Sequence, residues 1–252
     1  MSLAVVTVAS GGLPVVELAA GKLGLPVTEA TNGRGIAVTK VVGKPAMPVV
    51  FDTIGVAPPM VPATFNGTPS ASVVVSNGGL TVTHGSTNNA TGVFSAASKA
   101  SGKLYFEVLI QTSISNANAV GIKLYAGGVF SDATGTFPNG VGVQLGATNS
   151  FIYANNVSTA KNLGTQAIGD VICCAIDLDA RLAWFRRNAG NWNADAAANP
   201  ATGTNGVVIP AGAQAPMVRF TNGPATDAFT GNFGASAFAQ AVPAGFTAGW
   251  PV

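Results

Sequence analysis

The pattern of apolar and polar positions from residue 64 onward is that of short strands separated by turn-forming residues. Segments of alternating residues end at Gly, Asn, Ser or Pro, and none of the segments keeps a helical period. Residues 104–110 (LYFEVLI) are the clearest predicted strand, while 72–75 and 80–83 flank Asn77-Gly78-Gly79, which predicts a hairpin. We expect further strands over 119–125, 140–145, 150–153, 171–178, 181–187, 217–220 and 230–233. Strands at this spacing predict an all-β sandwich or barrel.

Five short apolar phrases recur in the first fifty residues. They begin at residues 3, 13, 25, 36 and 47, and turn-forming residues such as Asn32-Gly33 separate them. A unit of one strand and one turn cannot bury a hydrophobic face alone. Pro occurs in three of the five phrases, which confines those strands to sheet edges or to strand starts. The predicted anchoring residues of this arm are Leu13, Pro14, Val15, Leu25, Pro26, Val27, Ile36, Val38, Met47, Pro48 and Val49.

Three outcomes are open for this arm. It lies extended over a neighbouring subunit and adds strands to exposed edges, it stacks on itself as a small β-domain, or it is a plain linker. We favour docking onto a partner, because a run of Val and Leu with no core of its own would aggregate in water. The predicted organisation is an anchoring arm over 1–55, a stiff Pro-rich spacer over 56–63 and a β-sandwich over 64–252.

The composition limits the classes of partner. Charged residues make up 9% of the chain, against about 25% in an average soluble domain, and the hydrophobic fraction of 48% allows a large core. A surface with so little charge is typical of a protein packed against copies of itself or other subunits. With a net charge of +2 and no basic cluster longer than Arg186-Arg187, we expect no nucleic-acid partner. Gly11, Gly12 and Pro14 interrupt the apolar N-terminus, so neither a targeting segment nor membrane insertion is expected.

Few residues are candidates for chemistry. His84 is the sole histidine, so a Ser-His-Asp or Cys-His arrangement would require it, yet its place before Gly85-Ser86 predicts an exposed loop. Asp177 and Asp179 are the nearest candidates for a Ca²⁺ site, but Asp179 more simply bonds the backbone of its own turn. We therefore expect no enzymatic activity, no bound metal and no cofactor.

Cys173 and Cys174 are adjacent, and their side chains are expected on opposite faces of one strand. Two reduced, structural cysteines are the favoured interpretation. The alternative is an intermolecular disulfide formed by whichever of the two is exposed.

Two loop regions carry the predicted surface binding residues. Aromatic side chains combined with Arg or Asn stack on sugars and form hot spots for proteins. A structural role remains open as well, in which Trp192 covers the edge of the sandwich. The candidates are Phe130, Asp132 and Phe137 in one region and Arg186, Arg187, Trp192 and Asn193 in the other.

Three ordered stretches resemble the SPRY domain family. Residues 101–108 (SGKLYFEV) resemble its strand motif sGkwYfEv. Its hairpin motif GDviGvalDldagtlwFrkNg is similar to residues 169–172, 175–180 and 182–188, and its closing motif NFGqrPFay.pPaGF to residues 232–234, 238 and 243–246. The chain departs from the family where Cys173-Cys174 replace small residues and where Phe238 lacks a preceding Pro.

The resemblance implies a SPRY-like (concanavalin-like) antiparallel β-sandwich. It implies a binding or structural module rather than an enzyme. The Gly-, Ala-, Thr- and Asn-rich composition and the repeat arm are most similar to SPRY proteins of tailed bacteriophages and prophages. We therefore expect a virion structural protein, assembled in the host cytoplasm. Its arm would dock onto capsid or tail subunits or other copies, and its sandwich would face outward as decoration or as an adhesin for a host-surface glycan or protein. The alternative is a free, lectin-like module that binds glycan or protein and has a self-folded arm.

Overall fold

A computed structural model describes the strand residues 5–8 and 15–18, and residues 60–65, 69–70, 72–85, 91–112, 117–125, 130, 137–146, 148–221 and 226–252. The chain divides into two compact units, Met1–Pro59 and Met60–Val252. The boundary falls inside the predicted spacer over 56–63.

Two strands are described in the first unit. β1 (Val5–Val8) and β2 (Val15–Leu18) pair antiparallel, with Val5 opposite Leu18 and Val8 opposite Val15. These strands fall in the first two of the five repeated phrases. Val15 is therefore the one predicted anchoring residue that lies in a described strand. The other ten lie outside the described residues, and the docking role of the arm stays a prediction.

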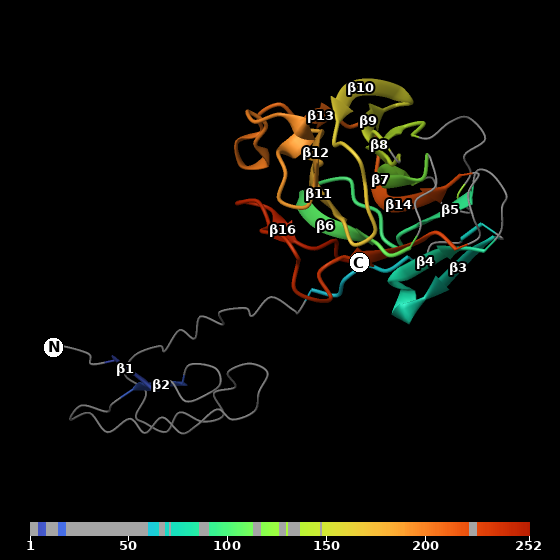
Figure 1. Cartoon of the computed structure of the whole chain (residues 1–252). Helices are drawn as coiled ribbons and strands as arrows, with labels where there is room; N and C mark the ends of the chain where they lie inside the picture. Colours follow the sequence, from blue (N-terminus) through green and yellow to red (C-terminus); the bar gives the residue numbers. More distant parts are fainter. Residues whose placement is uncertain are drawn as a thin grey trace, which may run out of the picture. The chain divides into compact units, whose positions relative to one another are not determined.

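The second unit is a sandwich of two sheets (Figure 1). The first sheet has the order β10-β9-β8-β7-β14-β5, and the second has the order β13-β12-β11-β6-β15-β4-β3. Neighbouring strands within these orders run antiparallel, and β16 (Thr247–Ala248) adds a short parallel pairing to β6. The first sheet consists of β5 (Thr91–Phe94), β7 (Ala119–Leu124), β8 (Gly140–Gln144), β9 (Phe151–Ala154), β10 (Val157–Asn162) and β14 (Gln214–Phe220). The second consists of β3 (Val73–Ser76), β4 (Thr81–His84), β6 (Lys103–Ile110), β11 (Val171–Asp177), β12 (Leu182–Arg187), β13 (Val207–Val208) and β15 (Ala228–Asn232).

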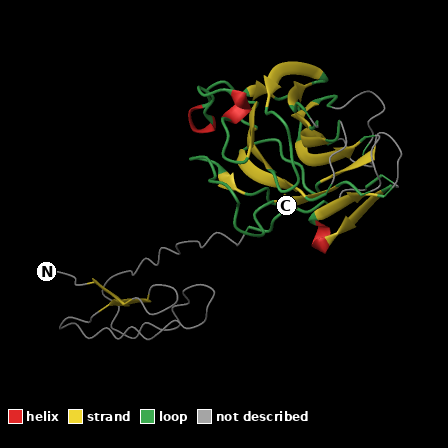
Figure 2. Cartoon of the chain, in the orientation of Figure 1, coloured by secondary structure: helices red, strands yellow, loops and turns green. Residues whose placement is uncertain are grey.

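The helical content of the described residues is confined to three short 3-10 turns, which stand out among the strands in Figure 2. They are η1 (Asn77–Gly79), η2 (Trp192–Ala194) and η3 (Pro200–Thr202). Within the described part of the chain, the structure contains no helix long and apolar enough to cross a membrane. The predicted all-β, antiparallel fold is thus confirmed, including the hairpin of β3 and β4 around η1.

The main core lies between the two sheets. Every second residue of a strand faces inward, so Phe106 of β6, Phe185 of β12 and Phe229 of β15 meet Val120 and Ile152 from the first sheet in one buried cluster. All five are fully buried. Burial of one such side chain contributes about 1.5–3 kcal/mol, so this cluster is the main source of stability for the sandwich.

Both ends of the second unit pair with each other. The amide of Ala63 donates to the carbonyl of Trp250 at 2.8 Å, and the amide of Val252 donates to the carbonyl of Val61 at 2.9 Å. Trp250 is fully buried, and its indole Nε1 donates to the carbonyl of Ala97 at 3.0 Å. Residues 61–63, at the end of the predicted spacer, therefore belong to the sandwich.

The prediction that His84 lies in an exposed loop is wrong. His84 is the last residue of β4, it is fully buried, and its ring lies parallel to that of Phe220 with centroids 5.1 Å apart. The reason is the period of the strand, because His84 shares the inward face with Val82, two residues earlier.

The two cysteines occupy opposite faces of β11, as predicted, but neither is exposed. Cys174 belongs to the core between the sheets, and Cys173 to a second buried cluster on the outer face of the second sheet. Both thiols are free and fully buried. The structure therefore gives no support to the alternative of an intermolecular disulfide, which requires an exposed cysteine, and that alternative stays untested.

Candidate binding surface on the outer face of the second sheet

One row of side chains crosses four strands on the outer face of the second sheet. Asn232 of β15 pairs with Glu107 of β6, which pairs with Cys173 of β11, which in turn pairs with Arg186 of β12. Residues paired in this way project from the same face of a sheet. The row therefore places an amide, a carboxylate, a thiol and a guanidinium side by side.

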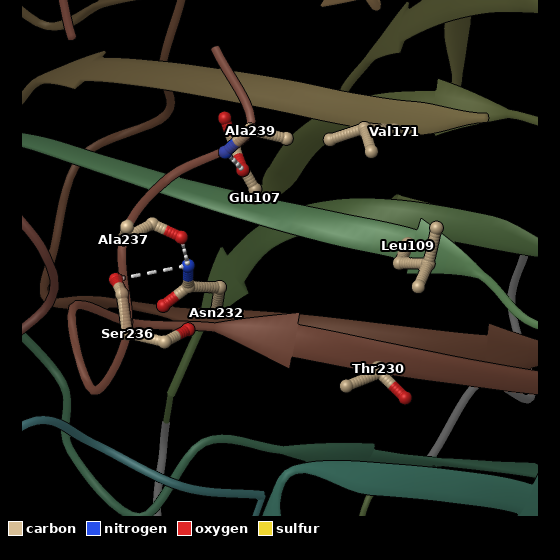
Figure 3. A pocket seen from close by; sticks show the side chains of 8 residues that line it. All are labelled: Glu107, Leu109, Val171, Thr230, Asn232, Ser236, Ala237 and Ala239. Atoms are coloured by element: carbon tan, nitrogen blue, oxygen red, sulfur yellow. Dashed lines mark hydrogen bonds between the residues drawn. The ribbon is translucent and has the colours of Figure 1, made fainter. Parts of the chain in front are cut away.

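The loop over residues 234–249, which we call the cover loop, lies across this row. The Glu107 carboxylate accepts a hydrogen bond from the amide of Ala239 at 2.8 Å, which Figure 3 shows. It accepts another from the amide of Gln240 at 2.9 Å. It also accepts one from the hydroxyl of Tyr105 at 2.7 Å. Glu107 is 3% exposed, and a carboxylate so deeply buried is stable only when such donors satisfy it.

The two ends of the row bind the carbonyls of the same loop. The Asn232 side-chain amide donates to the carbonyls of Ser236 at 3.2 Å and Ala237 at 3.0 Å. The Arg186 guanidinium donates to the carbonyl of Ala241 at 3.2 Å. Asn232, Glu107 and Arg186, taken along the row, thus bind successive parts of the main chain from residue 236 to residue 241. None of these contacts involves a side chain of the loop.

Aromatic side chains of the cover loop and of the sheet add an apolar contact. Phe238 meets Tyr105 edge to face with ring centroids 4.9 Å apart, and Phe246 meets Trp184 at 6.4 Å. Tyr105, Trp184 and Phe246 belong with Cys173 to the second buried cluster, and Phe238 packs against it. The outer face of this sheet is therefore a second, smaller core.

A hollow of about 270 Å³ remains between the cover loop and the sheet (Figure 3). Three of its polar side chains already have partners: Glu107 and Asn232 bind the loop, and the Thr230 hydroxyl lies 2.8 Å from that of Thr81. Ligand pockets commonly measure about 300–1,000 Å³, so the hollow suits one or two apolar side chains rather than a cofactor. It is lined by Glu107, Leu109, Val171, Thr230, Asn232, Ser236, Ala237 and Ala239.

The structure brings two of the predicted binding residues together. The Arg186 guanidinium lies over the Trp192 ring, 4.3 Å from its centroid, at the β12 end of the row. Arg187 forms an ion pair with Asp170 at 3.3 Å instead. The binding role of Arg186, Arg187 and Trp192 stays a prediction, and Asp132 lies outside the described residues.

The predicted surface position is wrong for Phe130, Phe137 and Asn193, which are all buried. Phe137 lies so close to Gly142 that a Cβ atom there would come within 2.5 Å of its ring. The Asn193 side chain accepts from the amide of Phe185 at 2.9 Å and donates to the carbonyl of Asn205 at 3.0 Å. Phe130 and Phe137 therefore pack within the sandwich unit, and Asn193 links β12 to a neighbouring loop by hydrogen bonds.

Burial shifts the pKa values of several groups near the two sheets. It raises the pKa of the Cys173 and Cys174 thiols, so both are protonated and unreactive near neutral pH. On the first sheet, burial and then the charge of Arg219 lower the pKa of Lys123 to about 8. The Lys123 ammonium lies over the Phe130 ring, 4.9 Å from its centroid.

The acidic candidates for a cation site have other partners. Asp177 is 1% exposed, pairs with Lys103 at 3.0 Å and accepts from the amide of Ala180 at 2.8 Å. Asp179 accepts from the amide of Gly102 at 2.9 Å, rather than from its own turn as predicted. Among the residues that the structure describes, no group of three or more His, Cys, Asp or Glu side chains could hold a metal ion.

Neither Glu107 nor Asn232 was predicted as a binding residue, although both lie in stretches that resemble the SPRY family. A charged residue inside an otherwise apolar strand, as in 104–110, was the available signal, because a buried carboxylate requires donors nearby. Tyr105 was visible as one nearby donor, but the other two, the amides of Ala239 and Gln240, could not be predicted because they lie more than a hundred residues away along the chain.

The sequence matches no protein-family model and no curated protein. Solved structures that are similar to the chain include SPRY domains. The SPRY domain of human HERC1 has 19% sequence identity and a TM-score of 0.48, with 63% of this chain and 91% of that chain covered. The TRIM65 PSpry domain has 14% identity and a TM-score of 0.47, covering 67% and 90%. A human SPRY domain has 20% identity and a TM-score of 0.46, covering 66% and 98%.

Proposed function

We propose that this chain is a non-enzymatic protein-binding module and that the outer face of its second sheet binds polypeptide. The observation that carries the proposal is the row of Asn232, Glu107 and Arg186. These side chains already hold the main chain of a bent segment, residues 236–241, through its amides and carbonyls. The adjoining hollow offers Leu109 and Val171 to an apolar side chain of a partner.

The setting that we propose is a bacteriophage virion, assembled in the host cytoplasm. Residues 1–55 dock onto capsid or tail subunits, and the sandwich is displayed outward as decoration or as a host-surface adhesin. Support comes from the charged fraction of 9%, the repeated apolar phrases and the sequence resemblance to phage SPRY proteins. A surface with few charges suits dense packing against other subunits, because few ions have to be desolvated.

Deletion of residues 1–50 tests the arm. The second unit has its own core, so the sandwich is expected to fold without them. We expect the shortened protein to be absent from purified particles, while the full chain is incorporated. Incorporation of both at equal levels would contradict the docking role of the arm.

Substitution at the hollow tests the binding face. Thr230→Arg places a long cation at its rim and is expected to abolish capture of the partner protein from a lysate of host cells or from particles. Val157→Arg is the matched control, because Val157 is 68% exposed on β10 of the other sheet. Equal capture by the two variants would contradict a binding role for this face.

The alternative of a free, lectin-like module has one observation in its favour, the antiparallel pairing of β1 and β2 within the first unit. A self-folded arm predicts a full-length protein that is monomeric and soluble. Against glycan stacking, one face of the Trp192 ring carries the Arg186 guanidinium at 4.3 Å. Sedimentation of the full chain separates the two proposals, since docking through the arm predicts self-association or aggregation in the absence of a partner.

A further inference from the structure

The cover loop begins and ends at one point of the sandwich. Its flanking residues, Phe233 and Trp250, are both fully buried, and the amide of Trp250 donates to the carbonyl of Phe233 at 3.0 Å. A surface loop of up to about 16 residues whose two ends meet in this way is an Ω-loop, a class that is often functional. The stem is thus fixed in the core, while residues 234–249 lie on the outside of the sheet.

A glycine in an unusual conformation stands at each end of the loop. Gly234 has φ 101° and Gly249 has φ 136°, which side-chain-bearing residues rarely adopt. Met60 packs against both positions. A Cβ atom added at Gly234 would lie 2.5 Å from the Met60 Cε, and one added at Gly249 would lie 2.4 Å from it. Glycines at paired positions give the main chain the freedom to turn there while the stem stays in place.

Two sets of contacts hold the loop to the sheet: the row of side chains beneath residues 236–241, and main-chain pairing near its C-terminal end, where Thr247, Ala248 and Gly249 pair with Leu104 and Tyr105 of β6. Asn232, Glu107 and Arg186 supply the polar contacts, and Phe238 and Phe246 supply the aromatic ones. The regular structure of the loop is confined to the two-residue strand β16, and opening of the loop breaks its short pairing with β6. A segment with exposed small side chains and few buried contacts opens at a lower free energy than the sheets of a core.

We propose that the cover loop is a lid, which opens as one unit about Gly234 and Gly249 while the sandwich remains folded. Opening uncovers the row of Glu107, Cys173 and Arg186, together with the ring of Tyr105. This inference rests on the proposed function, because the uncovered row is the polypeptide-binding face described above. In the closed state residues 236–241 occupy that face, and the lid thereby regulates access to it.

The two cysteines report separately on the lid and on the core. Cys173 lies in the row beneath the lid, between Glu107 and Arg186, whereas Cys174 faces the core between the sheets. We compare Cys174→Ala, which keeps only Cys173, with Cys173→Ala, which keeps only Cys174, by the rate at which an aromatic disulfide reagent labels the remaining thiol under native conditions. We expect Cys173 to be labelled at least tenfold faster than Cys174. Equal rates would overturn the proposal, because they mean that both thiols become exposed only when the sandwich unfolds.

Weakening the polar contacts of the lid provides a second readout. Glu107→Gln in the Cys174→Ala background loses a charge-assisted acceptor and is expected to accelerate labelling of Cys173 about tenfold or more. Asn232→Ala is the matched variant, since Asn232 holds the same loop but does not pair with Cys173 across the sheet. In the Cys174→Ala background, Asn232→Ala is also expected to accelerate labelling of Cys173. In the Cys173→Ala background, both substitutions are expected to leave labelling of Cys174 within twofold of the rate without them. Equal acceleration of Cys173 and Cys174 by both variants would again mean global unfolding and would overturn the lid.

Failure of the lid and failure of the proposed function give different results. The labelling experiment is carried out on the full chain without a partner, so it reports on opening alone. If Cys173 and Cys174 are labelled equally but Thr230→Arg still abolishes partner capture, the partner binds at the hollow with the cover loop in place, and the lid proposal is wrong. If Cys173 is labelled faster but Thr230→Arg has no effect on capture, the lid stands and the binding face falls.

Discussion

The hydroxyl of Tyr105 donates a hydrogen bond to the carboxylate of Glu107 at 2.7 Å, on the outer face of β6. Tyr105 is fully buried and Glu107 is 3% exposed, although both project away from the main core. Residues two apart on a strand share a face, so this pair lies directly beneath the cover loop. The pair shows that the second sheet is buried on both of its faces in this region.

Removal of the Glu107 side chain is expected to destabilise the protein. Glu107→Ala leaves the Tyr105 hydroxyl and the amides of Ala239 and Gln240 without their acceptor. We expect the free energy of unfolding in urea to fall by about 2–4 kcal/mol. Lys161→Ala is the control, since its ion pair with Asp195 spans 4.0 Å near the surface and contributes less than about 1 kcal/mol. Equal effects of the two substitutions would contradict a structural role for Glu107.

Glycines on the outer face of the first sheet provide the space for Phe137. A Cβ atom at Gly142 would lie 2.4 Å from the carbonyl oxygen of Val120 and 2.5 Å from the Phe137 ring. Gly142→Ala is therefore expected to lower the free energy of unfolding by about 2–3 kcal/mol through overpacking. At Gly78 nothing lies within 4 Å of an added Cβ atom. Gly78→Ala is therefore expected to lower the free energy of unfolding only by the strain of the left-handed backbone conformation, about 1 kcal/mol. A thermal melt in which Gly142→Ala is no less stable than Gly78→Ala would show that the sheet relaxes around the methyl group.

Lys123 is expected to make stability depend on pH under alkaline conditions. Its pKa is lowered to about 8 in the folded state from 10.5, chiefly by burial. Between these values the unfolded chain binds more protons at this residue, so its contribution to the free energy of unfolding rises from pH 8 towards pH 10. Cys173 and Cys174 act in the opposite direction, because burial raises their pKa values.

The contribution of Lys123 is isolated by comparison with Lys123→Met. As the pH rises from 8 to 10, the free energy of unfolding of the unsubstituted protein is expected to increase relative to that of the variant. Urea denaturation at each pH measures it. A difference that is constant across this range would mean that Lys123 titrates with an ordinary pKa.

Divalent cations are expected to leave the protein unchanged. The Asp177 carboxylate is already committed to Lys103 at 3.0 Å and to the amide of Ala180. We therefore expect the same Tm in calcium chloride and in EDTA. A rise in Tm with Ca²⁺ that Asp177→Asn abolishes would reveal a site at this turn. On its own, Asp177→Asn is expected to cost about 1 kcal/mol, since Lys103 is 41% exposed and solvent screens the ion pair.

Strands with strong local signals were predictable, and those without them were missed. β6, β11 and β12 follow from apolar and β-branched residues between turn formers. β10 (VSTAKN) was not predicted, because it is a polar edge strand whose register with β9 shifts between Ser158 and Asn162. β5 (TGVF), β13 and β16 were also missed. β13 and β16 have only two residues each, and β5 has only two large apolar residues, so these segments carry too little pattern.

By itself, the sequence determined the all-β class, the β3–β4 hairpin, and the placement of Cys173 and Cys174 on opposite faces of one strand. These features depend on turn chemistry and on a period of two, both of which are local. Only the tertiary structure decided that both cysteines, Phe130 and Asn193 are buried, and that Glu107, Asn232 and Arg186 bind one loop. Burial depends on which distant segment covers a face, and the loop that covers this one lies more than a hundred residues from Glu107 along the chain.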